Sequence, residues 1–240
     1  MIEILTNTTR GVNILPLTET RRCPVSHVDL AITFVPHIKA LSTAQIGEIL
    51  HMTTDVAIKE MKPCEMGICR RNAPLISVAY SLLREGKAVM IKGRDIGANM
   101  VNLIGKLNSK SIAQLIDKAE AYRSKESEKL LAMGRKGENR LQALNDRIDT
   151  LIALCEGFDT IKQLIDRINS IFSDDTTAKR IILSTVHKAK GLEADTVYIL
   201  DADKIMLPMT QDWTIQQEQN LAYVAYTRSK HTLVMVNDKK

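Results

Sequence analysis

Short apolar segments rich in β-branched residues alternate with helical segments along most of this sequence, and this alternation constrains the fold more than any other feature. Two helical segments, 24–38 and 74–86, begin with proline, and the second stops at Gly86. Continuous apolar runs are typical of strands buried on both faces of a parallel sheet. The pattern therefore predicts an α/β fold in which helices flank a parallel sheet. The expected strands are 11–17, 67–70, 88–93, 180–186, 196–202 and 231–236.

The middle of the sequence shows no strand pattern. Between Ser111 and Phe172, leucine and isoleucine recur in a charge-rich helical background, and the stretch 133–139 contains glycines expected to break one helix. Because this segment separates strands that should share one sheet, we interpret it as two or three helices inserted into the α/β domain. Its balanced charge favours a solvated helical subdomain over a DNA-binding one. The expected division is 1–96 and 179–240 for the two parts of the α/β domain, with 97–178 as the helical insertion.

Composition narrows the class of protein further. The hydrophobic content of 45% fits a globular protein with a sizeable core, and the net charge of +5, whose basic excess lies in the two outer segments, suits contact with a polyanion. The four cysteines form no C-x-x-C pair and are not spaced as zinc ligands are, so no metal site is expected. Their arrangement predicts a protein of a reducing compartment. No apolar run reaches the length of a signal peptide core or a membrane span, which predicts a cytoplasmic protein without a membrane partner.

Four motifs occur in an informative order. Segment 184–202 reads STVHKAKGLEADTVYILDA, and segment 216–236 reads QQEQNLAYVAYTRSKHTLVMV. Upstream, 17–24 reads LTETRRCP, and 67–93 contains an R-x-N turn that leads into a helix and a strand. These segments resemble motifs V, VI, IV and IVa of UvrD/Rep-like superfamily 1 DNA helicases. The resemblance covers roughly 15–96 and 179–237 and implies the second RecA-like (2A) domain of such a helicase, with the helical middle in the place of the 2B subdomain.

Two arginines are candidate catalytic residues. ATP hydrolysis spreads negative charge over the γ-phosphoryl oxygens, and guanidinium groups supplied by a neighbouring domain stabilise that charge. The resemblance implies this role for Arg22 of motif IV and Arg228 of motif VI. Arg21 replaces the usual tyrosine beside Arg22, and an arginine in a helix is otherwise most often a partner in a surface ion pair.

Three further residues are candidates for the nucleotide site. The resemblance implies that Glu193 binds the ribose, although its carboxylate could instead cap a helix. Gly191 allows a close backbone bend before it and is equally well explained as a turn residue. Glu218, which opens motif VI, is expected to orient one of the arginines, while Gln219 and Asn220 replace arginines frequent in the family.

Five residues are candidates for contact with single-stranded DNA. Thr185 and His187 end a predicted strand, where an α/β sheet presents side chains to ligands, and Lys190 follows them. The resemblance implies DNA contact for these residues and for Arg70 and Asn72 of the R-x-N turn. A packed loop histidine and solvated loop charges remain the alternatives.

The P-loop pattern G-x-x-x-x-G-K-[ST], which cradles the β- and γ-phosphates and places magnesium, does not occur in the 240 residues. Asp201 follows an apolar strand as a Walker B aspartate does, but its place after motif V favours a core strand. The resemblance thus implies ATP with Mg²⁺ held mainly by a first, N-terminal RecA-like domain, from the same protein or a separate subunit, with single-stranded DNA as the other partner. The chain alone is expected to be inactive. The alternative is a non-catalytic nucleic-acid-binding or protein-binding module that retains the helicase fold.

Overall fold

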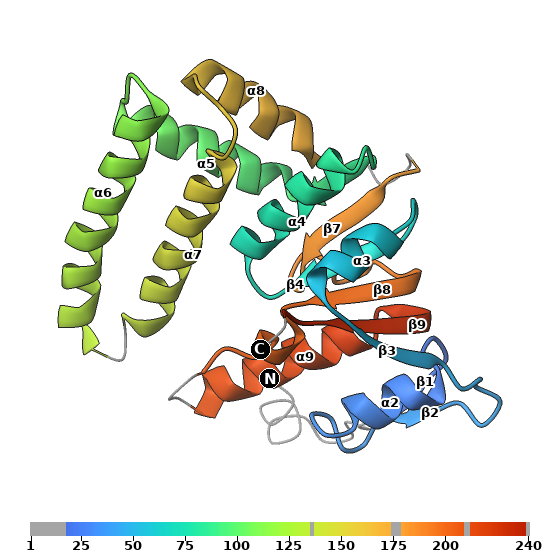
Figure 1. The fold of residues 1–240 in the computed structure, drawn as a ribbon. Coiled ribbons are helices and arrows are strands. Elements are labelled where there is room, and N and C mark those ends of the chain that lie inside the picture. The colour runs from blue at the N-terminus through green and yellow to red at the C-terminus, as the bar shows by residue number, and fades with distance from the viewer. Residues whose placement is uncertain (1–17, 135–136, 174–178, 209–211, 239–240) are drawn as a thin grey trace, which may run out of the picture.

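The fold was analysed in a computed structural model that describes residues 18–134, 137–173, 179–208 and 212–238. Figure 1 shows a central sheet with helices on both faces and a pair of long helices that projects away from it. The expected strand 11–17 lies outside the described residues. None of the described helices combines the length and apolar composition that a bilayer span requires.

The main sheet has seven strands in the part of the chain that the structure describes, in the order β3-β9-β8-β4-β7-β5-β6, and every pairing is parallel. Its strands are β3 (Glu48–Met52), β4 (Met66–Cys69), β5 (Val89–Lys92), β6 (Phe172–Ser173), β7 (Ile181–Thr185), β8 (Ala194–Leu200) and β9 (Ser229–Val236). The predicted α/β fold with a parallel sheet is therefore confirmed. A separate pair, β1 (Glu19–Thr20) and β2 (Lys39–Ala40), is also parallel.

Several elements differ from the predictions, among them the two-residue strands β1, β2 and β6, which were not predicted. The edge strand β3 was not predicted, because Glu48 and His51 interrupt its apolar pattern and face solvent. The helix expected over 24–38 is only α2 (Val25–Ala31), because the chain turns before Pro36, and a residue that precedes proline disfavours helical backbone. The helix expected over 74–86 is α4 (Asn72–Arg84).

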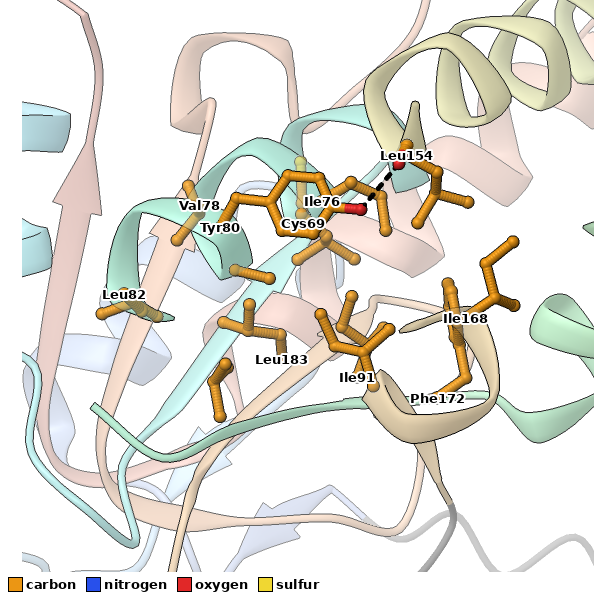
Figure 2. Close-up of a cluster of buried hydrophobic side chains, with 14 of the residues drawn as sticks. Cys69, Ile76, Val78, Tyr80, Leu82, Ile91, Leu154, Ile168, Phe172 and Leu183 are labelled. Atoms are coloured by element: carbon orange, nitrogen blue, oxygen red, sulfur yellow. Dashed lines mark hydrogen bonds between the residues drawn. The ribbon is translucent and has the colours of Figure 1, made fainter. Parts of the chain in front are cut away.

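Each face of the sheet is covered by its own hydrophobic core, because neighbouring residues in a strand point to opposite faces. Ile68 packs into the core beneath α9 (Asp212–Tyr226), whereas Cys69 packs into the larger core on the other face. Figure 2 shows this larger core, in which Leu183 of β7 lies near side chains of α4 and α8. The other helices that contribute to it are α3 (Thr54–Glu60), α5 (Arg94–Leu107), α6 (Ile112–Ala132), α7 (Glu138–Leu154) and α8 (Ile161–Ile171).

The helices between β5 and β7 play two different parts. Helices α6 and α7 form an antiparallel hairpin that extends beyond the sheet (Figure 1). Helices α5 and α8 instead place Leu103 and Ile168 in the larger core. The hairpin is attached through α7, where the Tyr80 hydroxyl of α4 donates a buried hydrogen bond of 2.8 Å to the Leu154 carbonyl (Figure 2). The division at residues 97 and 178 stays a prediction.

Candidate functional site

The predicted site residues lie at opposite ends of the parallel sheet. Arg70 and Asn72 directly follow β4, and His187 follows β7, so these residues lie at the carboxyl end. Glu193 and Arg228 directly precede β8 and β9, at the amino end. The part of α9 from Glu218 to Tyr226 runs between the two ends and spans roughly 12 Å at the rise of an α-helix, and Arg228 lies two residues beyond its end.

A pocket of about 850 Å³ lies at the carboxyl end. Helix α7 of the hairpin supplies one wall and α9 the other, with the segments after β4 and β7 between them. Polar side chains from all of these elements line it, among them Arg70, Gln142, Asp146, His187, Lys190 and Glu218. Its size and mixture of charged and amide groups suit an extended polar ligand.

Arg70 is held at the pocket by Glu218. The guanidinium donates from Nη2 to Oε1 at 2.7 Å and from Nε to Oε2 at 2.9 Å, in the bidentate geometry that makes such pairs strong. The Glu218 side chain is only 4% exposed, and it also accepts a bond from the Leu207 amide at 3.0 Å. The structure therefore places Glu218 with Arg70, whereas the sequence analysis linked it to Arg22 or Arg228.

Asn72 is held from the opposite wall. The Asp146 carboxylate of α7 accepts hydrogen bonds from the Asn72 backbone amide at 2.9 Å and from its side-chain Nδ2 at 2.8 Å. The Asn72 amide group is thus occupied within the protein, and its Oδ1 is buried without a donor among the described residues. Asn72 is consequently better placed to fix the turn than to contact a ligand with its side chain.

The segment after β7 presents two side chains to the pocket. His187 and Lys190 are exposed there, whereas Thr185 is buried and its hydroxyl accepts a bond from the Lys188 amide at 3.4 Å. Partial loss of water contact in the pocket, and then the positive charge of Arg70, lower the pKa of His187, so its ring is neutral near pH 7. Lys188 is engaged by Asp95 at 2.8 Å, which leaves Lys190 as the freer cation.

The amino end gathers Arg22, Glu193 and Arg228. The Arg22 guanidinium is 2.5 Å from the Glu193 carboxylate, and Lys230 is 2.8 Å from its other oxygen. Hydrogen bonding from Lys230 and then from Arg22 lowers the pKa of Glu193. Two cations thus share one carboxylate and Arg228 lies nearby, and this excess of positive charge suits a phosphate.

Arg228 is turned inward in this arrangement. Its side chain donates to the carbonyls of Val224 at 2.9 Å and Leu192 at 3.4 Å and to the Thr227 hydroxyl at 3.0 Å, and the residue is 7% exposed. Burial and then the nearby charge of Arg22 lower its pKa. Both effects disfavour the charged guanidinium, so an anion brought beside it would be stabilising. Contact with a phosphate outside the domain requires the side chain to rotate out.

Gly191 lies between the two ends, in the segment that leads from β7 to β8. Its φ of +89° is favoured by glycine, and open space surrounds the position of a Cβ, which fits a turn role. Glu193 lies two residues further on, and its carboxylate must leave Arg22 or Lys230 to bind a ribose hydroxyl.

Two contributors were missed by the sequence analysis. Asp146 lies in the helical insertion, 74 residues from its partner Asn72, and no local signal marks it. Lys230 lies within segment 216–236, two residues after Arg228, and could have been noticed as a further cation. Asp201 pairs with Arg71 at 3.3 Å, and no group of three or more His, Cys, Asp or Glu side chains suited to a metal occurs among the described residues.

Comparison with known proteins shows which families this chain is similar to. A family model described as UvrD-like helicase C-terminal domain matches residues 42–240. F-box DNA helicase 1 of Gallus gallus is 34% identical over 100 residues, which is 37% of this chain and 10% of that protein. ATP-dependent DNA helicase PcrA of Bacillus subtilis (strain 168) is 23% identical over 163 residues, which is 61% of this chain and 21% of that protein. The chain thus spans about a tenth to a fifth of these relatives.

A solved structure gives a weaker likeness. It is the C-terminal domain of a possible DNA helicase from Lactobacillus plantarum WCFS1, with 12% identity and a TM-score of 0.41 over 91% of this chain and 88% of that one.

Proposed function

Since the chain belongs to the UvrD-like helicase C-terminal domain family, we propose that it is the second RecA-like motor domain of an ATP-dependent DNA helicase or translocase. In this role it supplies Arg22 and Arg228 to an ATP-binding cleft shared with a RecA-like domain that carries a P-loop. It also contacts single-stranded DNA at the opposite end of its sheet.

The observation that carries the proposal is the cluster at the amino end of β8 and β9. Arg22 and Lys230 share the single carboxylate of Glu193, Arg228 lies near them, and burial and then the charge of Arg22 disfavour the charge on Arg228. ATP with Mg²⁺, when bound in the shared cleft, supplies the phosphoryl group and its developing negative charge. Arg22 and Arg228 donate hydrogen bonds to that charge, and the Glu193 carboxylate, released from Arg22, accepts one from the ribose.

The carboxyl end supports the DNA half of the proposal. His187 and Lys190 are exposed in the pocket, and Arg70 is fixed beside them by Glu218. Lys190 offers a charge to a phosphate, and the neutral His187 ring offers a hydrogen bond or a stacking face. Thr185 is buried and acts through the backbone of the segment that holds His187.

The test is reconstitution. ATP turnover is measured for the 240-residue chain alone, for a P-loop RecA-like domain of the same family alone, and for the mixture with and without single-stranded DNA. We expect negligible turnover by the chain and DNA-stimulated turnover by the mixture. Turnover by the chain alone that Arg228→Ala abolishes would contradict the proposal. A mixture no more active than its parts would favour a non-catalytic binding module.

A further inference from the structure

Helix α4 begins without a cap from its own sequence. Its N-cap residue is Arg71, whose side chain makes no capping hydrogen bond, so the first amides of the helix need an acceptor from elsewhere. The Asp146 carboxylate of α7 provides it: Oδ1 accepts from the amides of Asn72 at 2.9 Å and Ala73 at 3.4 Å. A carboxylate at this position is also favoured by the helix dipole.

The same turn is bound on its other side by α9. Arg70 pairs with Glu218 while Asn72 pairs with Asp146, so the three-residue turn 70–72 connects the two walls of the pocket. The hydrogen bonds to Glu218 use Nε and Nη2 of Arg70, and no bond from Nη1 occurs among the described residues, so Nη1 is a donor left for a ligand. Its position depends on both walls, and therefore on Asp146.

We propose that Asp146 is a positioning residue for nucleic-acid binding: the helical insertion holds turn 70–72, and with it Arg70, in the orientation that contacts a phosphate of single-stranded DNA. This inference rests on the proposed DNA-binding function. It assigns to α7 a role in binding that needs no contact between Asp146 and the DNA, and Asp146 as an anion would repel the DNA if it acted by charge alone.

The experiment separates these two effects. The affinity of the full chain for a fluorescein-labelled oligothymidylate is measured by anisotropy at several salt concentrations for Asp146→Ala, Asp146→Asn and Asp149→Ala. Asp149 is the matched control, because it lies one turn further along α7, lines the same pocket and pairs with Arg123 instead of the turn. All three variants remove one negative charge.

We expect Asp149→Ala to bind at least as tightly as the unmodified chain, and Asp146→Ala to bind about tenfold more weakly despite the lost charge. The slope of log affinity against log salt should fall by about one in Asp146→Ala, since one phosphate contact is lost. Asp146→Asn should restore most of the affinity. The Oδ1 of the new asparagine still accepts from the Asn72 backbone amide, and a rotated Asn72 side chain can accept a hydrogen bond from the new Nδ2.

Folding is checked by circular dichroism and thermal unfolding. Should Asp146→Ala fail to fold, Asp146→Ser carries the same comparison, since its side chain is too short to bridge both nitrogens. A folded Asp146→Ala or Asp146→Ser with the affinity and salt slope of the Asp149→Ala control would overturn the positioning role. An unmodified chain that does not bind the oligonucleotide would instead overturn the proposed DNA binding, and this inference with it.

Discussion

The two ends of the parallel sheet handle charge in opposite ways. At the carboxyl end most charges are matched within the protein: Arg70 with Glu218, Arg71 with Asp201 and Lys188 with Asp95. At the amino end Arg22 and Lys230 share one carboxylate, that of Glu193, and the acceptors of Arg228 among the described residues are all neutral. The balanced end suits an extended ligand bound through a few free groups. The end with excess positive charge suits a compact, highly charged anion.

The comparison also concerns how firmly each end is built. The Arg70–Glu218 pair is largely buried, whereas the side chains of Arg22 and Glu193 are 41% and 36% exposed. Exposed pairs exchange partners at little cost, while buried pairs do not. The Arg70–Glu218 pair at the carboxyl end is therefore preformed, and the exposed pairs at the amino end are able to rearrange.

The largest expected effect comes from a substitution that changes the amino end and leaves the carboxyl end intact. Arg228→Ala should lower DNA-stimulated ATP turnover of the reconstituted motor by about a thousandfold, as removal of an arginine finger does. Oligonucleotide affinity of the chain should change less than about twofold, because Arg228 lies beyond the far end of α9 from Glu218, which holds Arg70. Arg84→Ala is the control, since Arg84 is a helical arginine in an exposed pair with Glu156. Comparable loss of turnover in both variants would argue against a specific role for Arg228.

The next prediction compares the two ion pairs directly. Glu218→Ala should lower the free energy of unfolding by roughly 3 kcal/mol, because it leaves Arg70 largely buried without a carboxylate and the Leu207 amide without an acceptor. Glu193→Ala should cost less than about 1 kcal/mol, since its pairs are exposed. Urea unfolding monitored by circular dichroism measures both. Equal losses would show that the two ends are built alike.

A smaller effect should follow from loosening the pocket wall. Tyr80→Phe removes the buried hydroxyl that donates to the Leu154 carbonyl at the end of α7, and it should cost about 1 kcal/mol of stability. Tyr122→Phe on α6 is the control, because the Tyr122 hydroxyl makes no hydrogen bond among the described residues. Thermal unfolding of the two variants measures the difference. A loss of stability in Tyr122→Phe as large as that in Tyr80→Phe would contradict a stabilising role for the Tyr80 hydrogen bond.

The sequence predicted the sheet far better than the contacts around it. Strands such as 180–186 are buried on both faces, so their apolar runs mark them locally, and the order of the motifs identified the fold that they build. Edge strand β3 lacked that signal because exposed Glu48 and His51 interrupt its apolar run. Local sequence patterns do not predict which side chains pair with each other. Nothing in the sequence near Glu218 indicates Arg70 as its partner, and Asp146 is one of many charged residues in a segment predicted to be a solvated helix. The roles predicted for the site residues stay predictions.

The smallest expected effect concerns two histidines, one at each end. His27 of α2 is fully buried, its Nε2 is 3.1 Å from the Glu48 carbonyl near the amino end, and burial lowers its pKa. The unfolded chain then binds a proton near pH 6.5 while the folded chain does not, so this contribution to stability is complete above pH 6.5 and is lost as pH falls toward the lower folded pKa.

His27→Gln keeps a donor for the Glu48 carbonyl but does not titrate. The unfolding free energy of this variant should therefore decrease between pH 7 and 6 by a few tenths of a kcal/mol less than that of the unmodified chain. The pKa of His187 is also lowered, but its ring is exposed in the pocket. His187→Gln should therefore reduce the loss of stability between pH 7 and 6 less than His27→Gln does. Urea unfolding at both pH values compares them. A larger change in His187→Gln than in His27→Gln would mean that the carboxyl end, rather than the amino end, couples protonation to folding. Because the buried ring has no alternative solvent contact and the pocket ring does, we expect the amino-end histidine to dominate.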